Sequence, residues 1–252
     1  MNQKTVGTFA NFILLEEAKW DKDEFLKILK DEWQIEDEEP QDRNTEDNTD
    51  IIVISHNGTR ICVSLVPVPV PNGEAEFYAK SNYRWRNAEE IVKKHQAHLM
   101  VAILGKDVPA TEAGELLVKT VASCCMQEGV IGIYANKTVY QPEFYMEFVK
   151  LMKEGMFPIF NLIWFGLYNG KNGVCGYTCG MEQFGYDEME VIDSNEDAED
   201  IAEFLSDIAM YVILDDVVLR DGETIGFTEE EKITITKSEG IAIEGETLKI
   251  GF

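Results

Sequence analysis

The sequence predicts an α+β fold, in which helices pack on a mixed, largely antiparallel sheet and the chain ends in a C-terminal β-meander. Strand and helix patterns alternate in the earlier part of the chain, hairpin turns recur, and only short strand patterns follow residue 213. Frequent hairpins favour antiparallel pairing over a doubly wound parallel sheet. We expect residues 1–252 to form a single α+β unit, with a subdivision into lobes 1–75 and 76–252 as the alternative.

The first elements are a strand, a helix and an acidic loop. Val6–Leu15 is rich in β-forming residues and predicts a strand. A helix over residues 21–33 follows, because Asp21 can cap its start with Glu24 three residues on. Residues 36–50 contain almost no apolar side chain and predict an acidic loop.

The clearest turn of the chain joins two apolar runs, Ile51–Ser55 and Arg60–Val66. Between them lies Asn57-Gly58, a pair that tolerates the positive φ angles of a type I′ turn, so we expect a β-hairpin. The proline-rich run at residues 66–71 ends the second strand, because each proline removes a hydrogen-bond donor from the ladder.

Alternating elements follow the hairpin. Helical spacing and capping residues predict helices over residues 87–96, 111–128 and 142–154. The apolar runs Leu99–Leu104 and Val130–Ala135 predict buried strands between them.

A second hairpin and a final helix come next. Phe157–Tyr168 and Val174–Met181 flank a glycine- and asparagine-rich turn, which predicts another antiparallel pair. Ser194 is the expected cap of a helix over residues 195–213. The turns Asp221-Gly222, Ser238-Glu239-Gly240 and Glu244-Gly245 then divide the tail into short strands.

The composition excludes several classes of function. The chain has 47 acidic against 22 basic residues, a formal net charge of -25, and 45% hydrophobic residues. That charge argues against binding to nucleic acid or to an anionic membrane surface, and the apolar content argues against disorder. No signal peptide or membrane-spanning run is apparent, and five unevenly spaced cysteines suggest a reducing, cytoplasmic environment.

The negative charge is concentrated at the two ends of the chain. Residues 1–50 carry 15 acids and 6 bases, residues 51–181 carry 11 and 12, and residues 182–252 carry 21 and 4. Such asymmetry indicates a partner surface, so we expect a basic protein to dock on the 195–213 helix and the 36–50 loop. On that helix the candidate binding residues are Glu199, Asp200 and Glu203.

Common catalytic and metal-binding patterns are missing. His95 and His98 lack a third ligand at a recognised spacing, so we expect them to be core or helix-end histidines and predict no metal and no cofactor. Cys175 and Cys179 would lie about 13 Å apart on one strand face, too far for a disulfide, and we expect all five cysteines to be packing residues. No phosphate-binding loop or nucleophile elbow occurs.

One stretch is basic and aromatic against this acidic background, residues 77–98. Its candidate binding residues are Tyr83, Arg84, Trp85 and Arg86. Arginine and aromatic side chains together are typical of interface anchors and of pockets for anionic ligands. The plainer interpretation is that the stretch pairs with the acidic ends of the same chain, with Trp85 in the core.

Several motifs together carry a resemblance to a known family. They are Trp85 with Ala88-Glu89, His95 and His98 before Leu99–Gly105, Pro142-Glu143-Phe144-Tyr145, Trp164-Phe165-Gly166-Leu167, Gly176-Tyr177-Thr178-Cys179-Gly180, Met181-Glu182-Gln183-Phe184-Gly185, Asp221-Gly222-Glu223-Thr224-Ile225-Gly226-Phe227, Ser238-Glu239-Gly240 and Glu244-Gly245-Glu246-Thr247-Leu248-Lys249. The chain resembles a bacterial family of domains of unknown function, number 4261, over most of its length and most densely from about residue 82. The resemblance implies a soluble bacterial protein and assigns no catalytic residue.

We therefore expect a non-enzymatic protein-binding domain with an acidic docking surface, one version being an inhibitor or immunity-type protein. The alternative is an enzyme or small-molecule binder whose pocket gathers Tyr83, Trp85, His95, His98 and Tyr177. Exposed hairpin edges would also allow a homodimer.

Overall fold

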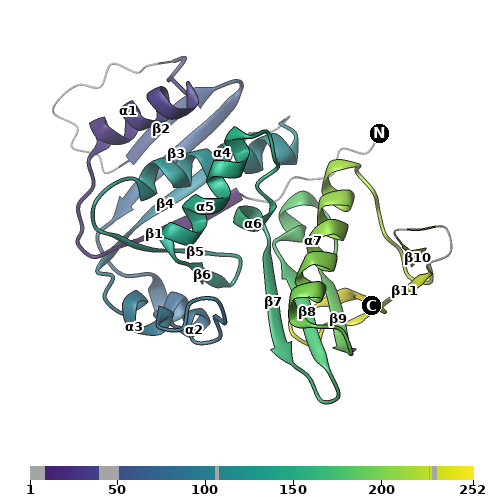
Figure 1. Cartoon of the computed structure of the whole chain (residues 1–252). Coiled ribbons are helices and arrows are strands. Elements are labelled where there is room, and N and C mark those ends of the chain that lie inside the picture. Colours follow the sequence, from purple (N-terminus) through teal and green to yellow (C-terminus); the bar gives the residue numbers. More distant parts are fainter. Residues whose placement is uncertain (1–8, 40–50, 106–107, 227, 229–231) are drawn as a thin grey trace. The chain divides into compact units, whose positions relative to one another are not determined.

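The chain folds into two compact units, described here separately (Figure 1). The computed structural model describes residues 9–39, 51–105, 108–226, 228 and 232–252. Contacts group residues 8–161 into one unit, called the N-terminal unit, and residues 162–252 into the main part of the other, called the C-terminal unit. Parts of three predicted features lie outside the described residues: 6–8 of the first strand, 40–50 of the acidic loop, and Phe227 of the tail motif.

The N-terminal unit is built on a six-stranded sheet in which all neighbours are antiparallel. The strand order is β2-β3-β4-β1-β5-β6. The strands are β1 (Phe9–Leu15), β2 (Ile51–His56), β3 (Thr59–Val66), β4 (Ala97–Leu104), β5 (Val130–Ala135) and β6 (Thr138–Tyr140). Because β3 pairs with β4 along its whole length, this sheet continues across residue 75, where the sequence suggested a boundary between lobes.

The predicted type I′ turn between β2 and β3 is confirmed. Asn57 and Gly58 have φ angles of 46° and 75°, so both central residues adopt the left-handed region. Glycine and asparagine reach that region at lower cost than other residues, which is why this dipeptide closes a two-residue hairpin. His56 then pairs directly with Thr59 across the turn.

Helices cover this sheet. They are α1 (Lys22–Trp33), α2 (Glu74–Ala79), α3 (Ala88–Val92), α4 (Ala110–Cys125) and α5 (Pro142–Lys153), with the 3-10 turn η1 (Pro71–Gly73) before α2 and the short α6 (Ile159–Leu162) at the boundary between the units. The predicted cap of α1 is confirmed, because the Asp21 carboxylate accepts hydrogen bonds from the backbone N–H groups of Asp23 and Glu24, each 3.0 Å long. Helix α4 packs against β1 and β4, and α2 and α3 lie against β6 and β5.

The C-terminal unit contains a second six-stranded sheet, which is mixed, and the predicted α+β class is confirmed. The strand order is β10-β11-β12-β9-β8-β7, with β12 and β9 parallel. The strands are β7 (Trp164–Asn169), β8 (Val174–Cys179), β9 (Met189–Ser194), β10 (Thr224–Ile225), β11 (Ile233–Glu239) and β12 (Glu246–Ile250), with the 3-10 helix η2 (Met181–Phe184) after β8. The last three strands form the expected meander.

The long helix α7 (Ala198–Leu214) packs on β7 and β8. Gly176 allows the close approach, since a Cβ atom there would lie 2.5 Å from Cγ2 of Ile201. The predicted helix start was wrong by three residues. Asp197, in extended backbone, precedes the helix, and the Ser194 hydroxyl instead accepts a hydrogen bond from Glu196 N–H in the preceding loop.

Candidate functional site

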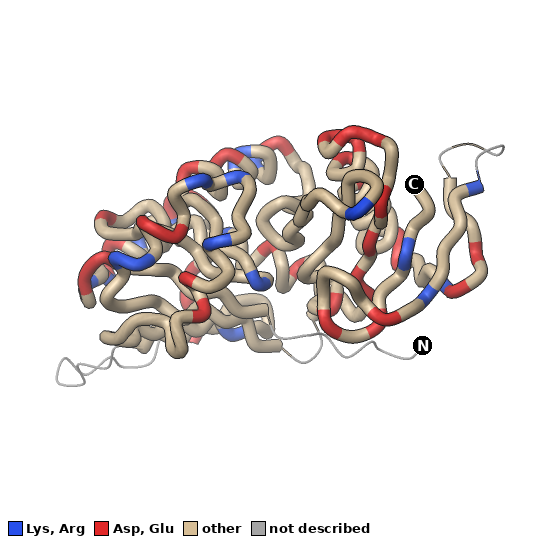
Figure 2. The backbone as a smooth tube through the Cα atoms, turned by 90° about the horizontal axis from the view of Figure 1, so that it is seen from below, with Lys and Arg blue, Asp and Glu red and all other residues tan. Residues whose placement is uncertain are grey.

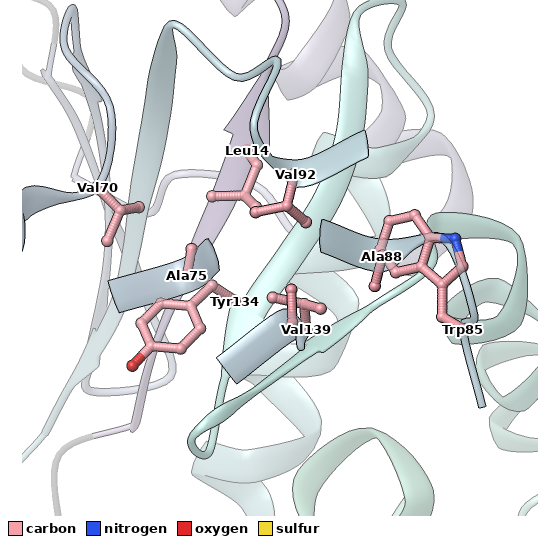
Figure 3. Packing of buried hydrophobic residues seen from close by; sticks show 9 residues of the cluster. Leu14, Val70, Ala75, Trp85, Ala88, Val92, Tyr134 and Val139 are labelled. Carbon is pink, nitrogen blue, oxygen red and sulfur yellow. The ribbon is translucent and has the colours of Figure 1, made fainter. Parts of the chain in front are cut away.

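Trp85, a predicted binding residue, lies in the core of the N-terminal unit. Its side chain is 8% exposed and belongs to a cluster with residues of β1, α3 and β6, where Figure 3 shows it beside Ala88. Gly132 of β5 lies next to the ring, because a Cβ atom there would be in van der Waals contact with the indole at 3.7 Å. Burial of this kind stabilises the fold and leaves little of the ring for a partner.

The neighbours of Trp85 are exposed. Tyr83, Arg84 and Arg86 lie at the surface, and Arg84 Nε donates a 2.8 Å hydrogen bond to the Tyr83 hydroxyl. The Arg84 guanidinium also lies 5.1 Å from the centre of the Tyr83 ring and 5.4 Å from that of Phe144 on α5. Contact with two aromatic rings orders an arginine by cation–π attraction. Desolvation raises the pKa of Tyr83, although Arg84 opposes the shift.

Two of the three lysines of the same stretch, Lys80 and Lys93, pair inside it. Glu89 accepts a 2.6 Å hydrogen bond from Lys93 and lies 4.0 Å from Lys80. The hydrogen bond to Lys93 is the main cause of the lowered pKa of Glu89. These contacts are local to α3 and the segment that precedes it.

His95 and His98 hold the proline-rich segment. His95 Nε2 accepts a 2.9 Å hydrogen bond from Val70 N–H, and His98 Nδ1 lies 2.9 Å from Val68 O. Since a carbonyl oxygen only accepts, His98 carries its proton on Nδ1. Both side chains are buried, and desolvation is the main cause of the lowered pKa of His98. This geometry gives both histidines a structural role.

Burial suppresses the reactivity of the two adjacent thiols of α4, those of Cys124 and Cys125. The five cysteines, all within the described ranges, form no disulfide, and burial raises the pKa of Cys125 to about 12 and that of Cys124 well above its ordinary value. A thiol so protonated is a poor nucleophile and a poor metal ligand. Across the ranges that the structure describes, no three His, Cys, Asp or Glu side chains are placed to hold a metal ion.

Tyr177, the last member of the predicted pocket, belongs to the C-terminal unit. It lies on β8 opposite Gly166 of β7, where a Cβ atom would be 2.1 Å from the Tyr177 ring. The glycine therefore lets the ring lie flat against the neighbouring strand. Trp85 and His98, two other members of that predicted pocket, are buried in the N-terminal unit.

Glu190, the second residue of β9, is a buried carboxylate that binds a distant loop. It accepts hydrogen bonds from Ile241 N–H at 3.0 Å and Ala242 N–H at 2.6 Å, and it pairs with Lys249 Nζ at 2.9 Å. Burial raises the pKa of Glu190, but these donors and the Thr247 hydroxyl outweigh it and hold the pKa below its ordinary value. The carboxylate thus fixes the turn between β11 and β12 onto the sheet.

Glu188, just before β9, is a second buried carboxylate, and it fixes the start of η2 to the sheet. It accepts 2.7 Å hydrogen bonds from the Thr178 hydroxyl and from Gly180 N–H. Here burial is the larger effect and raises the pKa of the carboxyl, although the hydrogen bonds lower it. Both carboxylates have partners within the fold, so we assign them to structure.

The exposed face of α7 is acidic. Glu199, Asp200, Glu203 and Asp207 are all exposed, whereas the opposite face buries Ile201, Leu205 and Ile208 against the sheet. Figure 2, with Asp and Glu red and Lys and Arg blue, shows where charged residues occur along the backbone. The three acidic residues predicted on this helix therefore share one solvent-facing surface.

The same face becomes apolar toward the end of the helix. Tyr211 and Leu214 are 45% and 50% exposed, and Val218, four residues after the helix, is 44% exposed. Residues three or four apart are neighbours on a helix surface, so Glu203, Asp207, Tyr211 and Leu214 form one stripe. We call this run of exposed side chains the α7 stripe.

A pocket of about 110 Å³ opens near the carboxyl end of α7. It is lined by Met181, Gly185, Tyr186, Asp187, Met189, Val212, Val218, Leu219 and Leu248. Its polar groups are engaged, because the Tyr186 hydroxyl donates a 2.7 Å hydrogen bond to Asp216 and Asp187 pairs with Lys237 at 2.8 Å. The sequence did not predict this pocket, whose lining comes from residues 181–189, α7, the segment after α7 and β12.

One region of the chain matches a known family of domains. Residues 177–251 match the family model of a domain of unknown function (DUF4261), so the resemblance found in the sequence is confirmed for this part of the chain. No curated protein and no solved structure matches. All residues that line the pocket and all of α7 lie inside the matched region. Among the described residues, no helix is long and apolar enough to cross a membrane.

Proposed function

We propose that the region matched by the family model is a protein-binding domain, which holds a basic partner on the acidic face of α7. In this proposal the protein acts as a binder rather than an enzyme, and an inhibitor or immunity-type role is one version of it. The partner would contribute lysines and arginines to that face.

The observation that carries the proposal is the arrangement of charge on α7. Glu199, Asp200, Glu203 and Asp207 are exposed on one side of a helix that contains no lysine or arginine. Acids in the first turn stabilise a helix by opposing its dipole, which accounts for Glu199 and Asp200. Glu203 and Asp207 lie beyond that turn, so the dipole does not explain them.

The distances suit contact with a single partner. Eight residues separate Glu199 from Asp207, or about 12 Å along a helix that rises 1.5 Å per residue. At physiological ionic strength, charges are screened over about 8 Å, so neighbouring acids reinforce one another while distant ones do not. Binding of this type is fast at low salt and weakens as salt rises.

An enzyme or small-molecule binder with a pocket around Trp85, His98 and Tyr177 was the alternative. Trp85 and His98 are only 8% and 4% exposed, and each has partners in the core of its own unit. We therefore argue the binding function alone.

A charge-reversal variant tests the proposal. The triple change Glu199→Lys, Asp200→Lys and Glu203→Lys removes the acidic face, and the matched control Glu90→Lys, Glu128→Lys and Glu154→Lys changes the charge equally at exposed sites of the N-terminal unit. Tagged full-length proteins are used for affinity capture from the native lysate at low and physiological salt. Circular dichroism establishes that each variant is folded.

We expect the wild-type and control proteins to recover the same basic protein, and the α7 variant to lose it. Recovery should fall as salt rises, because the contacts are exposed ion pairs. Equal recovery by both variants, or no basic protein at low salt, would contradict the proposal.

A further inference from the structure

We infer that the pocket near the end of α7 receives one apolar side chain of the same basic partner, so that the α7 stripe and the pocket form a single docking surface. This inference rests on the proposed function and specifies the partner. The partner segment would carry lysine or arginine next to a leucine- or methionine-sized side chain.

The first argument is continuity. Along the α7 stripe, Glu203 and Asp207 are followed by Tyr211 and Leu214 at spacings of four, four and three residues. Seven residues separate Asp207 from Leu214, or about 10 Å along the helix axis. None of these four residues lines the pocket, but Val218 does, and it is 44% exposed and follows Leu214 by four residues. The run of exposed side chains therefore reaches the pocket through Val218, and a short segment of a partner can touch both.

The second argument is size. Sites for small molecules and cofactors are typically about 300–1,000 Å³, whereas this pocket has about 110 Å³. An apolar cavity of about 150 Å³ holds a benzene molecule. The space therefore suits one aliphatic side chain and is too small for most metabolites.

The third argument is the chemistry of the lining. Met181, Met189, Val212 and Leu248 are apolar, and methionines adapt their shape to different side chains. The hydroxyl of Tyr186 and the carboxylate of Asp187 are already engaged by Asp216 and Lys237. An incoming polar group would lose its water without a strong new partner, so an apolar group is favoured.

Charge decides between a basic partner and a second copy of this chain. A two-fold dimer would place the same patch of both copies face to face. The acidic residues of the α7 stripe would then oppose each other in a protein of formal net charge -25. Like charges opposed in this way are repulsive, whereas a basic segment complements them.

Three synthetic peptides probe the surface. The first has three consecutive basic residues followed three positions later by leucine, since three extended residues span about 10 Å. The second replaces leucine by alanine, and the third replaces the basic residues by serine. Each is titrated into full-length protein that carries ¹³C-methyl methionine, and the NMR signals of Met181 and Met189 report the pocket.

We expect the basic leucine peptide to shift both signals saturably, and to bind about five- to tenfold more tightly than the alanine peptide, because the side chain is partly buried. The serine peptide should bind more weakly than the basic leucine peptide. Val218→Trp, which blocks the pocket mouth, should abolish the preference for leucine and keep salt-dependent binding. Ile241→Trp, at another exposed apolar position of the same unit, is the control.

The outcomes separate the two proposals. Equal affinity of the leucine and alanine peptides, or a preference for leucine that survives Val218→Trp, overturns the pocket inference and leaves the acidic docking face standing. Equal binding of the basic and serine peptides, together with failed capture of a basic protein, overturns the proposed function itself.

Discussion

Replacement of the buried carboxylate in Glu190→Gln should destabilise the C-terminal unit strongly. Glu190 is fully buried and accepts from Ile241 N–H, Ala242 N–H and the Thr247 hydroxyl, besides its ion pair with Lys249. The amide places an N–H₂ group where donors already point and leaves the ammonium of Lys249 without its counter-charge. Loss of one partner of a buried ion pair costs about 3–5 kcal/mol.

The lower end of that range is expected here. The Lys249 side chain is 15% exposed, and its Nζ also donates to Glu239 O at 3.0 Å, so part of its solvation is retained. We therefore predict a loss of about 3 kcal/mol in the free energy of unfolding of this unit. The double variant Glu190→Gln with Lys249→Met should recover about 1–2 kcal/mol of it, because no unpaired charge remains.

Hydrogen exchange combined with denaturant titration measures this effect locally. The amides of Ile241 and Ala242 should exchange much faster in Glu190→Gln, and the transition of the C-terminal unit should move to lower denaturant. The lowered pKa of Glu190 means that its contribution is present above its ordinary pKa of 4.5 and is lost as pH falls through the folded value. The difference between the two proteins should therefore shrink below about pH 4.5. A variant within about 0.5 kcal/mol of wild type at pH 7 would refute this reasoning.

Three further changes test the fold. Trp85→Ala should cost about 3–5 kcal/mol in the free energy of unfolding, because it leaves a cavity in the N-terminal core; a loss below about 1 kcal/mol by denaturant titration would show that the indole is not packed there. His98→Asn should remove a pH dependence, because a histidine whose pKa is lowered by burial stabilises the fold fully above its ordinary value of 6.5 and loses that contribution as pH falls below it. If the free energy of unfolding of the variant fell between pH 7.5 and 5 as steeply as that of wild type, this role would be contradicted. Gly176→Val should cost about 1–3 kcal/mol, since even a Cβ atom would meet Ile201 at 2.5 Å; a melting temperature equal to that of wild type would contradict the close packing of α7 on β8.

Local signals were read correctly from the sequence. The Asn57-Gly58 turn and the Asp21 cap depend on interactions within four residues, and both occur in the structure as expected. The strand β9 was missed because acidic side chains interrupt its apolar pattern. Glu190 is buried there only because loop residues more than fifty positions away supply its donors. Pattern reasoning along the chain has no access to such partners.

Short helices were missed for a different reason. Helix α2 has six residues and α6 has four, so neither completes two turns and neither displays a periodic apolar face. Residues 159–162 were therefore assigned to a strand that in fact begins at Trp164. Tertiary packing, rather than intrinsic propensity, stabilises helices of this length.

The candidate site could be predicted in part. Exposure of Glu199, Asp200 and Glu203 followed from the spacing of the apolar residues on the same helix, and the structure agrees. The pocket could not be predicted, because its lining combines η2, the loop from η2 to β9 with β9 itself, α7, the segment after α7 and β12. For Trp85 the sequence left two interpretations, an interface anchor and, as the plainer one, a core residue, and its packing agrees with the core residue.

The salt dependence of partner binding tests the central claim most directly. The basic protein recovered by affinity capture is titrated into the full-length chain by calorimetry between 50 and 300 mM salt, in parallel with the α7 charge-reversal variant. We predict at least about a tenfold weakening of the wild-type affinity across that range, and weak, nearly salt-independent binding of the variant. A wild-type dissociation constant that does not change with salt, or that the variant shares, would contradict an acidic docking face on α7.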